Sequence, residues 1–163
     1  MDQMKLLELL ANNPRSSVTD LADILGEEEK DVEEGIRELE ENKIICGYHT
    51  VINWDKTNND HIDAMIGVSA KPERNSGYDK IAERIAKFPE VSSLYLMSGT
   101  SEFMVSVNAK TMREVADFVG QKLAPIDGVT QTVTMFVLKK YKVNGIQMDM
   151  DEEIEDDRQL ISA

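Results

Sequence analysis

LADILGEEEKDVEEGIRELEENK, residues 21–43, decides the fold of the first part of this 163-residue chain. Leu21 and Leu25 lie four residues apart, which places them on one face of a short helix. Gly26 can adopt the left-handed conformation that ends such a helix. The small side chain of Ala22 lets a second helix approach closely after this turn. The stretch therefore predicts a helix-turn-helix.

The second helix of this pair has one apolar face and an acidic surface. Val32, Ile36 and Leu39 recur at helical spacing and mark the side that we expect to be buried. Residues 26–43 also hold nine Asp or Glu and only three Lys or Arg. Because positive charge supplies most of the affinity for phosphates, this composition favours an alternative, a three-helix packing module that does not bind nucleic acid. Glu27 favours the same alternative, since the position after the turn glycine is usually apolar.

Another helix is predicted before this pair. Met4, Leu7 and either Leu10 or Ala11 lie at helical spacing near the N-terminus, and the two asparagines and the proline that follow are typical of a helix end. Ser17 can accept a hydrogen bond from the start of the next helix, with Asp20 placed as in a capping box. The first third of the chain therefore predicts three helices.

The net charge of −13 is distributed unevenly along the chain. It is −8 over residues 1–54, +1 over residues 55–144 and −6 over residues 145–163. No apolar run approaches the roughly 18 residues that cross a bilayer, and no signal-peptide pattern is present. We therefore expect a cytoplasmic protein without membrane contact. The single cysteine, Cys46, lies in an apolar sequence and is predicted to be a small core residue.

The second part of the chain alternates between strand and helix patterns. Residues 45–53 are β-branched and aromatic and predict a strand that leads out of the helices, and the polar residues 54–60 predict a linker. The acidic residues 145–163 predict a tail that is mobile or folds only against a partner. Between linker and tail, strands are predicted in residues 61–70, 91–98, 102–109 and 129–142, and helices in residues 77–90 and 111–125.

The order of these elements is βαββαβ, which is typical of two helices on one face of a four-stranded antiparallel sheet, the ferredoxin-like arrangement. The predicted fold class is α+β, a helix-turn-helix followed by a ferredoxin-like domain. The expected domains are the helix-turn-helix domain at residues 1–53, the linker at 54–60, the ferredoxin-like domain at 61–144 and the acidic tail at 145–163.

Few residues of the first domain can contact a DNA phosphate. Hydroxyls at a helix N-terminus can help the basic residues, because the free N–H groups there favour an anion. The alternative is that these residues are ordinary surface side chains, with Lys30 paired to Glu34 and Arg37 paired to Glu33 or Glu41 within the helix. The candidate DNA-binding residues are Arg15, Ser16, Ser17, Thr19, Lys30, Arg37 and Lys43.

The loop LMSGTSEF, residues 96–103, is the second candidate site. Its hydroxyl groups, its glycine and its one carboxylate could hold the charged ends of a small zwitterion. The alternative is a plain turn between two strands. The candidate effector-binding residues in the loop are Ser98, Gly99, Thr100, Ser101 and Glu102.

The sequence offers little for catalysis. His49 and His61 lie singly on predicted strands, without a cysteine, serine or paired carboxylate at motif spacing. Metal-ligand spacing and a glycine-rich phosphate loop are also absent. The only short basic cluster, residues 139–142, is predicted to end an edge strand. We therefore expect no enzyme activity, no cofactor and no metal.

Three helices, a strand, a linker and βαββαβ, in this order, resemble the Lrp/AsnC family of transcriptional regulators. The resemblance extends from Met4 to about Lys142. Its most specific parts are residues 21–53, which include a Gly-Tyr pair at Gly47 and Tyr48, and GVTQTVTMFVLKKYK, residues 128–142, with Thr134 at the family's usual position. The outer surface of the acidic helix departs from the family, in which serine, threonine and arginine are usual.

The resemblance implies a winged helix-turn-helix joined to a ligand-sensing domain. In the family, the sheets of these domains pair into dimers, and dimers often form octamers around amino-acid effectors. Gly99 matches the glycine of the loop that lines the family's effector site, and Glu102 stands where an aspartate is common. Thr134 joins the effector-binding candidates on the same basis. The loop lacks the aromatic residue often found in the family.

These observations predict a transcriptional regulator that binds double-stranded DNA weakly and in a salt-sensitive way, forms a homodimer or an octamer, and senses a small amino-acid-like effector. One alternative is a metabolite-sensing oligomer that has lost DNA binding and uses its acidic helical domain for protein contacts. Another is an enzyme related to tetrapyrrole decarboxylases of similar architecture, in which His61 is the only candidate to act.

Overall fold

The computed structural model describes residues 2–148 and divides into two compact units after Thr50. The division falls slightly before the boundary predicted after residue 53. Each unit has its own buried core, made from different parts of the chain. They are therefore described one at a time.

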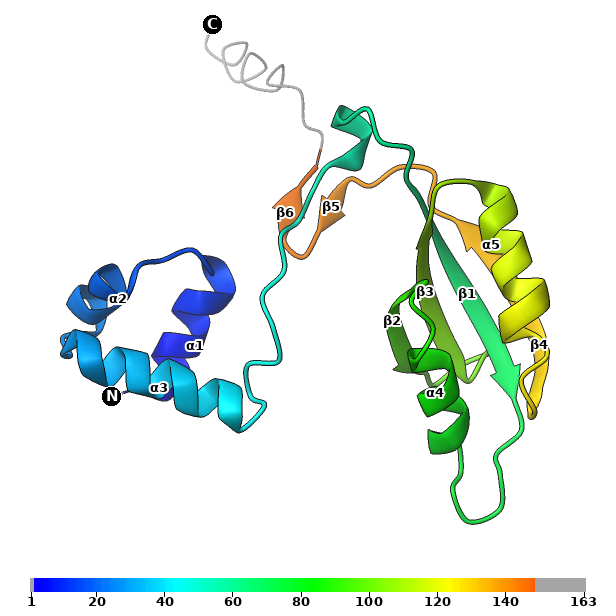
Figure 1. Cartoon of the computed structure of the whole chain (residues 1–163), viewed down its shortest axis with the longest axis horizontal. Coiled ribbons are helices and arrows are strands. Elements are labelled where there is room, and N and C mark those ends of the chain that lie inside the picture. The colour runs from blue at the N-terminus through cyan, green and yellow to red at the C-terminus, as the bar shows by residue number, and fades with distance from the viewer. Residues whose placement is uncertain (1, 149–163) are drawn as a thin grey trace, which may run out of the picture. The chain divides into compact units, whose positions relative to one another are not determined.

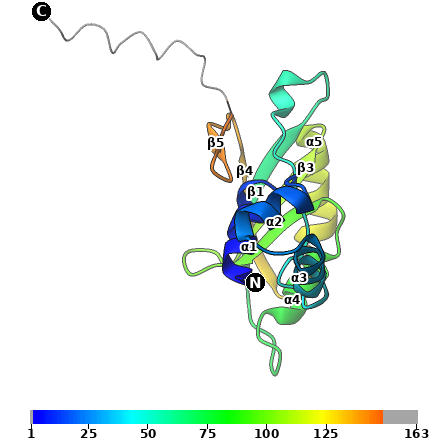
Figure 2. The same cartoon turned by 90° about the vertical axis from the view of Figure 1, so that its left-hand side faces the viewer.

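The N-terminal unit consists of three helices (Figures 1 and 2). These are α1 (Gln3–Asn12), α2 (Val18–Leu25) and α3 (Glu29–Glu41). All three contribute buried side chains to one small core, namely Leu6, Leu10, Leu21, Ala22, Val32 and Leu39. In α1, the buried stripe is Leu6 and Leu10, whereas Met4 is 66% exposed, so its predicted place on that stripe is wrong.

The turn between α2 and α3 follows the sequence prediction. The Ser17 hydroxyl caps α2 by accepting a hydrogen bond from the Asp20 N–H at 3.0 Å. Gly26 has a φ of 70°, which is left-handed, and its N–H donates to the Ala22 carbonyl at 2.8 Å. This geometry closes the last turn of α2 and starts the chain toward α3.

The strand predicted at residues 45–53 is wrong. Residues 46–53 form no strand, and no backbone N–H of residues 46–52 donates to a backbone carbonyl within residues 2–148. A strand requires a neighbour for its ladder of hydrogen bonds, and residues 2–50 contain none, so no wing is present in this part of the chain. Cys46 is exposed, which corrects its predicted place in the core.

The C-terminal unit contains the predicted βαββαβ order. Its antiparallel sheet has the strand order β2-β3-β1-β4, and α4 and α5 cover one face of it (Figure 1). This is the ferredoxin-like arrangement. The elements are β1 (Ile62–Ala70), α4 (Asp79–Ala86), β2 (Val91–Leu96), β3 (Phe103–Ala109), α5 (Met112–Phe118), the π-helical turn η2 (Val119–Leu123) and β4 (Val129–Phe136).

The core of this unit lies between the sheet and its two helices. It is larger than the N-terminal core and is mostly aliphatic. Its buried side chains are Ala64, Ile66, Val68, Ala70, Ile81, Ile85, Phe103, Val105, Val107, Val115, Phe118 and Leu123. On the other face of the sheet, no helix from residues 51–148 packs against the strands (Figure 1).

Short elements flank the sheet at both ends of the unit. The segment predicted as a linker contains the 3-10 helix η1 (Trp54–Lys56). The last predicted strand ends at Phe136, and the chain then forms a hairpin of β5 (Lys142–Val143) and β6 (Ile146–Gln147). The basic cluster at residues 139–142 therefore does not end an edge strand. The predicted tail begins inside this hairpin, and residues 149–163 lie outside the described residues.

Candidate functional site

Helix α3 presents an acidic surface. It holds seven carboxylates and two basic residues, and all of these side chains are exposed. Arg37 bonds to Glu34 at 3.1 Å and to Glu41 at 3.3 Å, which confirms the predicted pairing with Glu41 and replaces Glu33 by Glu34. Exposed pairs of this kind add little stability. Their consequence here is that the one arginine of α3 lies between two negative charges.

The candidate residues at the start of α2 differ in whether hydrogen bonds within the unit occupy their side chains. Arg15 and Ser16 lie in the loop before the helix. The Ser17 hydroxyl is occupied by the cap and also donates to a carboxylate oxygen of Asp20 at 2.6 Å. The Thr19 hydroxyl donates to Glu29 Oε1 at 2.8 Å. Ser17 and Thr19 therefore organise the turn, and Arg15 is the basic residue just before α2.

Lys30 and Lys43 lie at opposite ends of α3. Lys30 is exposed in its first turn, and Lys43 follows its C-terminus in a left-handed conformation with φ 58°. Gly35 is buried on the inner side of the helix, so it does not face outward where a basic residue could serve DNA. The seven candidates are thus spread over the surface of α2, α3 and the loop before α2, and their contact with DNA stays a prediction.

Tyr48 links the residues after α3 back to that helix. Its hydroxyl donates to Glu40 Oε1 at 2.9 Å. Partial burial raises the pKa of Tyr48, and the hydrogen bond to the Glu40 carboxylate raises it further. The hydroxyl therefore keeps its proton at neutral pH and remains a donor.

The loop between β2 and β3 borders a hollow of about 310 Å³. Four of the six effector-binding candidates line it, which are Ser98, Gly99, Thr100 and Ser101. Its remaining walls come from the uncovered face of the sheet and from the end of β2, and they are Gly67, Met97, Met104, Val133 and Met135. The arrangement joins hydroxyl groups on one side to an apolar surface on the other, as small-molecule sites commonly do.

Gly67 on β1 positions this loop by its lack of a side chain. A Cβ at this residue would lie 2.9 Å from Ser101 Oγ and 3.5 Å from Ser101 Cβ. Ser101 can therefore rest against the backbone of the central strand. Sequence analysis did not select Gly67, and only the register of β1 against β3 and β4 reveals its place beside the loop.

Glu102 and Thr134 do not line the hollow. One Glu102 carboxylate oxygen accepts from the Ala70 N–H at 2.8 Å, which ties the loop to the end of β1. Thr134 pairs with Ile66, whose side chain is buried under the helices, whereas the adjacent Val133 and Met135 point to the uncovered face. Within one chain, Thr134 thus lies on the other side of the sheet from the hollow. Its role as an effector contact stays a prediction.

The uncovered face of the sheet is partly apolar. Met65, Tyr95, Val133 and Met135 point from it and are 39%, 55%, 47% and 46% exposed. They lie on three of the four strands, and Met65 and Met135 are direct neighbours in register. Exposed apolar groups that adjoin one another in this way are typical of a surface that another protein covers.

A polar cluster at the start of β1 was not found from the sequence. His61 Nε2 lies 3.0 Å from Asp63 Oδ1, and the Asn108 amide donates to the same oxygen at 2.9 Å. The ammonium of Lys140 pairs with the other Asp63 oxygen. The His61 ring also stacks on Trp54 of η1 at 5.0 Å. The cluster holds η1 and the segment after β4 to the start of β1 and the end of β3, the two inner strands.

No helix within residues 2–148 combines the length and apolar character needed to span a bilayer. The same part of the chain has no group of three or more His, Cys, Asp or Glu that could hold a metal ion. These two findings concern only the described residues.

Comparison with known proteins gives matches to the C-terminal unit and to most of the chain. Residues 63–146 match the model of the Lrp/AsnC ligand binding domain. The HTH-type transcriptional regulator YugG of Bacillus subtilis is 38% identical over 98% of this chain and 95% of its own length. The HTH-type transcriptional regulator LrpA of Pyrococcus abyssi is 34% identical over 84% of this chain and 94% of its own length.

A solved structure shows the same fold. It is a complex of a transcriptional regulator from Neisseria meningitidis with L-Met, and it matches with a TM-score of 0.68 over 86% of this chain and 90% of that one. At a sequence identity of 23%, this match is evidence for the fold alone. The relatives are transcriptional regulators, not enzymes. Together with the family model, they show that this chain belongs to the Lrp/AsnC family.

Proposed function

We propose that this protein is a DNA-binding transcriptional regulator whose C-terminal unit forms oligomers and senses a small amino acid. The observation that carries this proposal is the helix-turn-helix of α2, Gly26 and α3 in the same chain as a ligand-binding domain that has an open hollow beside its loop. The named relatives support it, because two HTH-type transcriptional regulators match this chain over nearly their whole length.

DNA binding must overcome the acidity of α3. Lys and Arg side chains gain affinity for DNA by displacing counterions from its phosphates. The carboxylates of this helix repel the phosphates. Arg15, Lys30, Arg37 and Lys43 are the basic groups available for contact. Several subunits together add many weak contacts, so binding of moderate strength is compatible with this surface.

The DNA proposal is tested by titrating the purified protein against DNA from upstream of its own gene at roughly 50 and 200 mM salt. Binding should weaken with salt, and Arg37→Ala should reduce it at least severalfold. Arg113→Ala is the matched control, because it removes the same charge from an exposed position on α5 in the other unit. Absence of binding at low salt, with and without amino acids, contradicts the proposal.

Amino-acid sensing is assigned to the hollow beside residues 97–101. A zwitterion there can donate from its ammonium group to the hydroxyls of Ser98, Thr100 or Ser101 and place an apolar side chain against Met104 and Met135. The L-Met complex of the Neisseria meningitidis regulator supports an amino acid as the ligand class.

The sensing proposal is tested by measuring the melting temperature and the oligomeric state with each amino acid in turn. The effector should raise the melting temperature, since it binds only the folded state. Thr100→Trp should abolish this rise by filling the hollow, whereas Thr100→Val keeps the size of the side chain and should retain much of it. A full response in the tryptophan variant shows that the effector binds elsewhere.

Oligomerisation is assigned to the uncovered face of the sheet. Covering Met65, Tyr95, Val133 and Met135 removes apolar area from water, which is the main favourable term in association. Met135→Glu places a charge on this face and should shift the protein toward monomers in sedimentation experiments. Glu83→Gln, at an exposed position on α4, is the control.

The alternative is a metabolite-sensing oligomer that has lost DNA binding. The bonds of Arg37 to Glu34 and Glu41 favour it, because they hold the one arginine of α3 among carboxylates. In that case the acidic helix meets a basic protein partner. The same salt titration distinguishes the two functions, since the alternative gives no DNA binding while the amino-acid response remains.

A further inference from the structure

The loop between β2 and β3 makes few bonds of its own. Residues 97–100 are exposed. Within residues 2–148, no backbone group of residues 98–101 forms a hydrogen bond to another backbone group, and their hydroxyls form none either. A loop with so few contacts takes its position from whatever holds its two ends.

Glu102 holds the end of this loop in two ways. Its backbone carbonyl accepts from the Met97 N–H at 2.8 Å, which closes the base of the loop. Its side-chain oxygen Oε2 accepts from the Ala70 N–H at 2.8 Å, and this second bond is the clamp between the loop and β1. The clamp is the only hydrogen bond within residues 2–148 that joins a side chain of residues 98–102 to another part of the chain.

The clamp takes the place of a missing ladder bond. The pairing of β1 with β3 ends at Val68 and Phe103, so Ala70 lies beyond it. Ala70 is only 7% exposed, and a buried N–H without an acceptor costs free energy. Glu102 supplies this acceptor at the point where the backbone of β3 no longer runs beside β1.

Ala70 is itself firmly held. Its side chain belongs to the core of the C-terminal unit, and it pairs with Val129 of β4. The next residue, Lys71, donates from its N–H to the Gly128 carbonyl at 2.8 Å. Close packing leaves a residue in this environment little room to shift. The clamp therefore fixes the loop to the core instead of to another exposed segment.

A second contact joins the loop to β1 at Gly67. The Ser101 side chain rests so close to this glycine that a Cβ there would lie 2.9 Å from Ser101 Oγ. Ser101 and Glu102 are half-buried, whereas residues 97–100 are exposed. These two neighbouring residues thus set the place of the exposed part of the loop.

We propose that Glu102 is the positioning residue of the amino-acid site, because its clamp to Ala70 holds the hydroxyl groups of the loop in place around the hollow. This inference rests on the amino-acid sensing proposed above. Glu102 does not line the hollow, so it acts through the loop and not on the effector. The length of its side chain therefore matters more than its charge.

Three substitutions separate length from charge. Glu102→Gln keeps the length and an acceptor oxygen, and so keeps the clamp. Glu102→Asp keeps the charge but is one methylene shorter, and Glu102→Ala removes the acceptor. Affinity for an amino acid should change less than about threefold in Glu102→Gln and fall about tenfold in the other two, since binding must then order the loop. Full affinity in Glu102→Asp with loss in Glu102→Gln overturns the proposal, because it shows a charge that the effector contacts.

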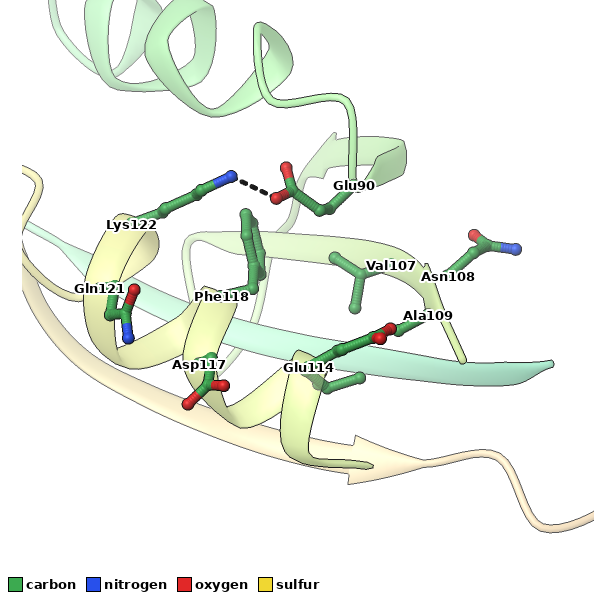
Figure 3. Close-up of a pocket in the computed structure, with 10 residues that line it drawn as sticks. Glu90, Val107, Asn108, Ala109, Glu114, Asp117, Phe118, Gln121 and Lys122 are labelled. Atoms are coloured by element: carbon green, nitrogen blue, oxygen red, sulfur yellow. Dashed lines mark hydrogen bonds and ion pairs between the residues drawn. The ribbon is translucent and has the colours of Figure 1, made fainter. Parts of the chain in front are cut away.

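Calorimetric titration of the full chain with L-methionine measures this affinity, since a flexible apolar side chain suits the wall formed by Met104 and Met135. Glu90→Ala is the matched control. Figure 3 shows Glu90 facing Lys122, its ion-pair partner, and Glu90 lies just before β2, at the end of that strand away from the loop. The control removes a bonded carboxylate from the same unit and should leave L-methionine affinity unchanged.

Amide hydrogen exchange, followed by nuclear magnetic resonance, tests the clamp without a ligand. The Ala70 N–H should exchange slowly in the wild type and in Glu102→Gln, and at least about tenfold faster in Glu102→Asp and Glu102→Ala. Equal protection in all four proteins overturns the clamp, whatever the titration shows. Faster exchange with unchanged L-methionine affinity overturns its role in sensing. If the wild type binds no L-methionine while the exchange pattern is as expected, the proposed sensing of this amino acid fails and the clamp stands.

Discussion

The N-terminal unit buries six side chains among three helices, whereas the C-terminal unit buries twelve between a sheet and two helices, counted over the described residues. The two units also differ in the side chains that they expose to solvent. Helix α3 exposes seven carboxylates, while the sheet exposes Met65, Tyr95, Val133 and Met135. The first unit thus has a small core and an acidic helix surface, and the second has a large core and a sheet face that is partly apolar.

This difference assigns separate physical roles to the units. Charge interactions at an exposed helix are weak, long-ranged and screened by salt. Apolar burial on the sheet is short-ranged and insensitive to moderate salt. Salt should therefore alter what the N-terminal unit binds much more than it alters the association of the C-terminal unit.

The substitution with the largest expected effect on stability shortens one leucine side chain in each core. Leu39 and Leu123 are 1% and 0% exposed, and Leu→Ala at either site should cost about 2–5 kcal/mol of unfolding free energy. The smaller unit has less stability to lose, so Leu39→Ala should unfold the three helices near room temperature. Leu123→Ala should only lower the melting temperature of its unit.

Two spectroscopic signals separate the units in this experiment. Trp54, the single tryptophan, belongs to the C-terminal unit, so its fluorescence reports unfolding there. Far-ultraviolet circular dichroism also reports the helices of the N-terminal unit. In Leu39→Ala, helical signal should be lost while the fluorescence transition stays unchanged. One shared transition in both signals shows that the two units unfold together.

Local signals in the sequence predicted most of the fold correctly. The Ser17 cap and the Gly26 turn depend on atoms a few residues away, and both are present as predicted. The alternation of strand and helix patterns was also sufficient for the βαββαβ order. The strand at residues 45–53 failed for a different reason, because its composition favours an extended chain but only a neighbouring strand can pair with it.

The candidate sites were predicted less completely, because they depend on register. Ser98 and Thr100 were found in the loop itself, but Gly67 reaches it only through the pairing of β1 with its neighbours. Thr134 shows the same limit, since the alternation along β4 places it on the face opposite Val133. His61 and Asp63 could have been paired from their spacing on one strand, whereas Asn108 could not.

A smaller effect compares two glycines with positive φ. Gly26 has φ 70° and open space around its missing Cβ, so Gly26→Ala should cost about 1 kcal/mol through backbone strain alone. Gly128 has φ 94°, and a Cβ there would lie 2.8 Å from Ile81 Cδ1 and 3.3 Å from the Lys71 carbonyl oxygen. Gly128→Ala adds this crowding and should cost about 3 kcal/mol.

Denaturant titration with the same two signals measures both changes. Gly26→Ala should affect only the helical signal of the N-terminal unit, and Gly128→Ala should move the Trp54 transition. The double substitution Gly128→Ala with Ile81→Val removes the crowding methyl group and should restore part of the loss. Equal costs at both glycines contradict the role assigned to Ile81.

The smallest expected effect concerns the charge of α3. Glu33 and Glu38 are exposed, so replacing both by glutamine should change unfolding free energy by less than about 0.5 kcal/mol each. If α3 approaches phosphates, the same change relieves repulsion and should tighten DNA binding severalfold at roughly 50 mM salt, with a smaller gain at 200 mM. The double replacement Asp79→Asn and Glu83→Gln, at exposed positions of α4, removes the same two negative charges and should leave DNA binding unchanged. An equal gain from the α4 variant means that total charge, not the surface of α3, limits binding, and no gain from either variant places the DNA contact away from the outer face of this helix.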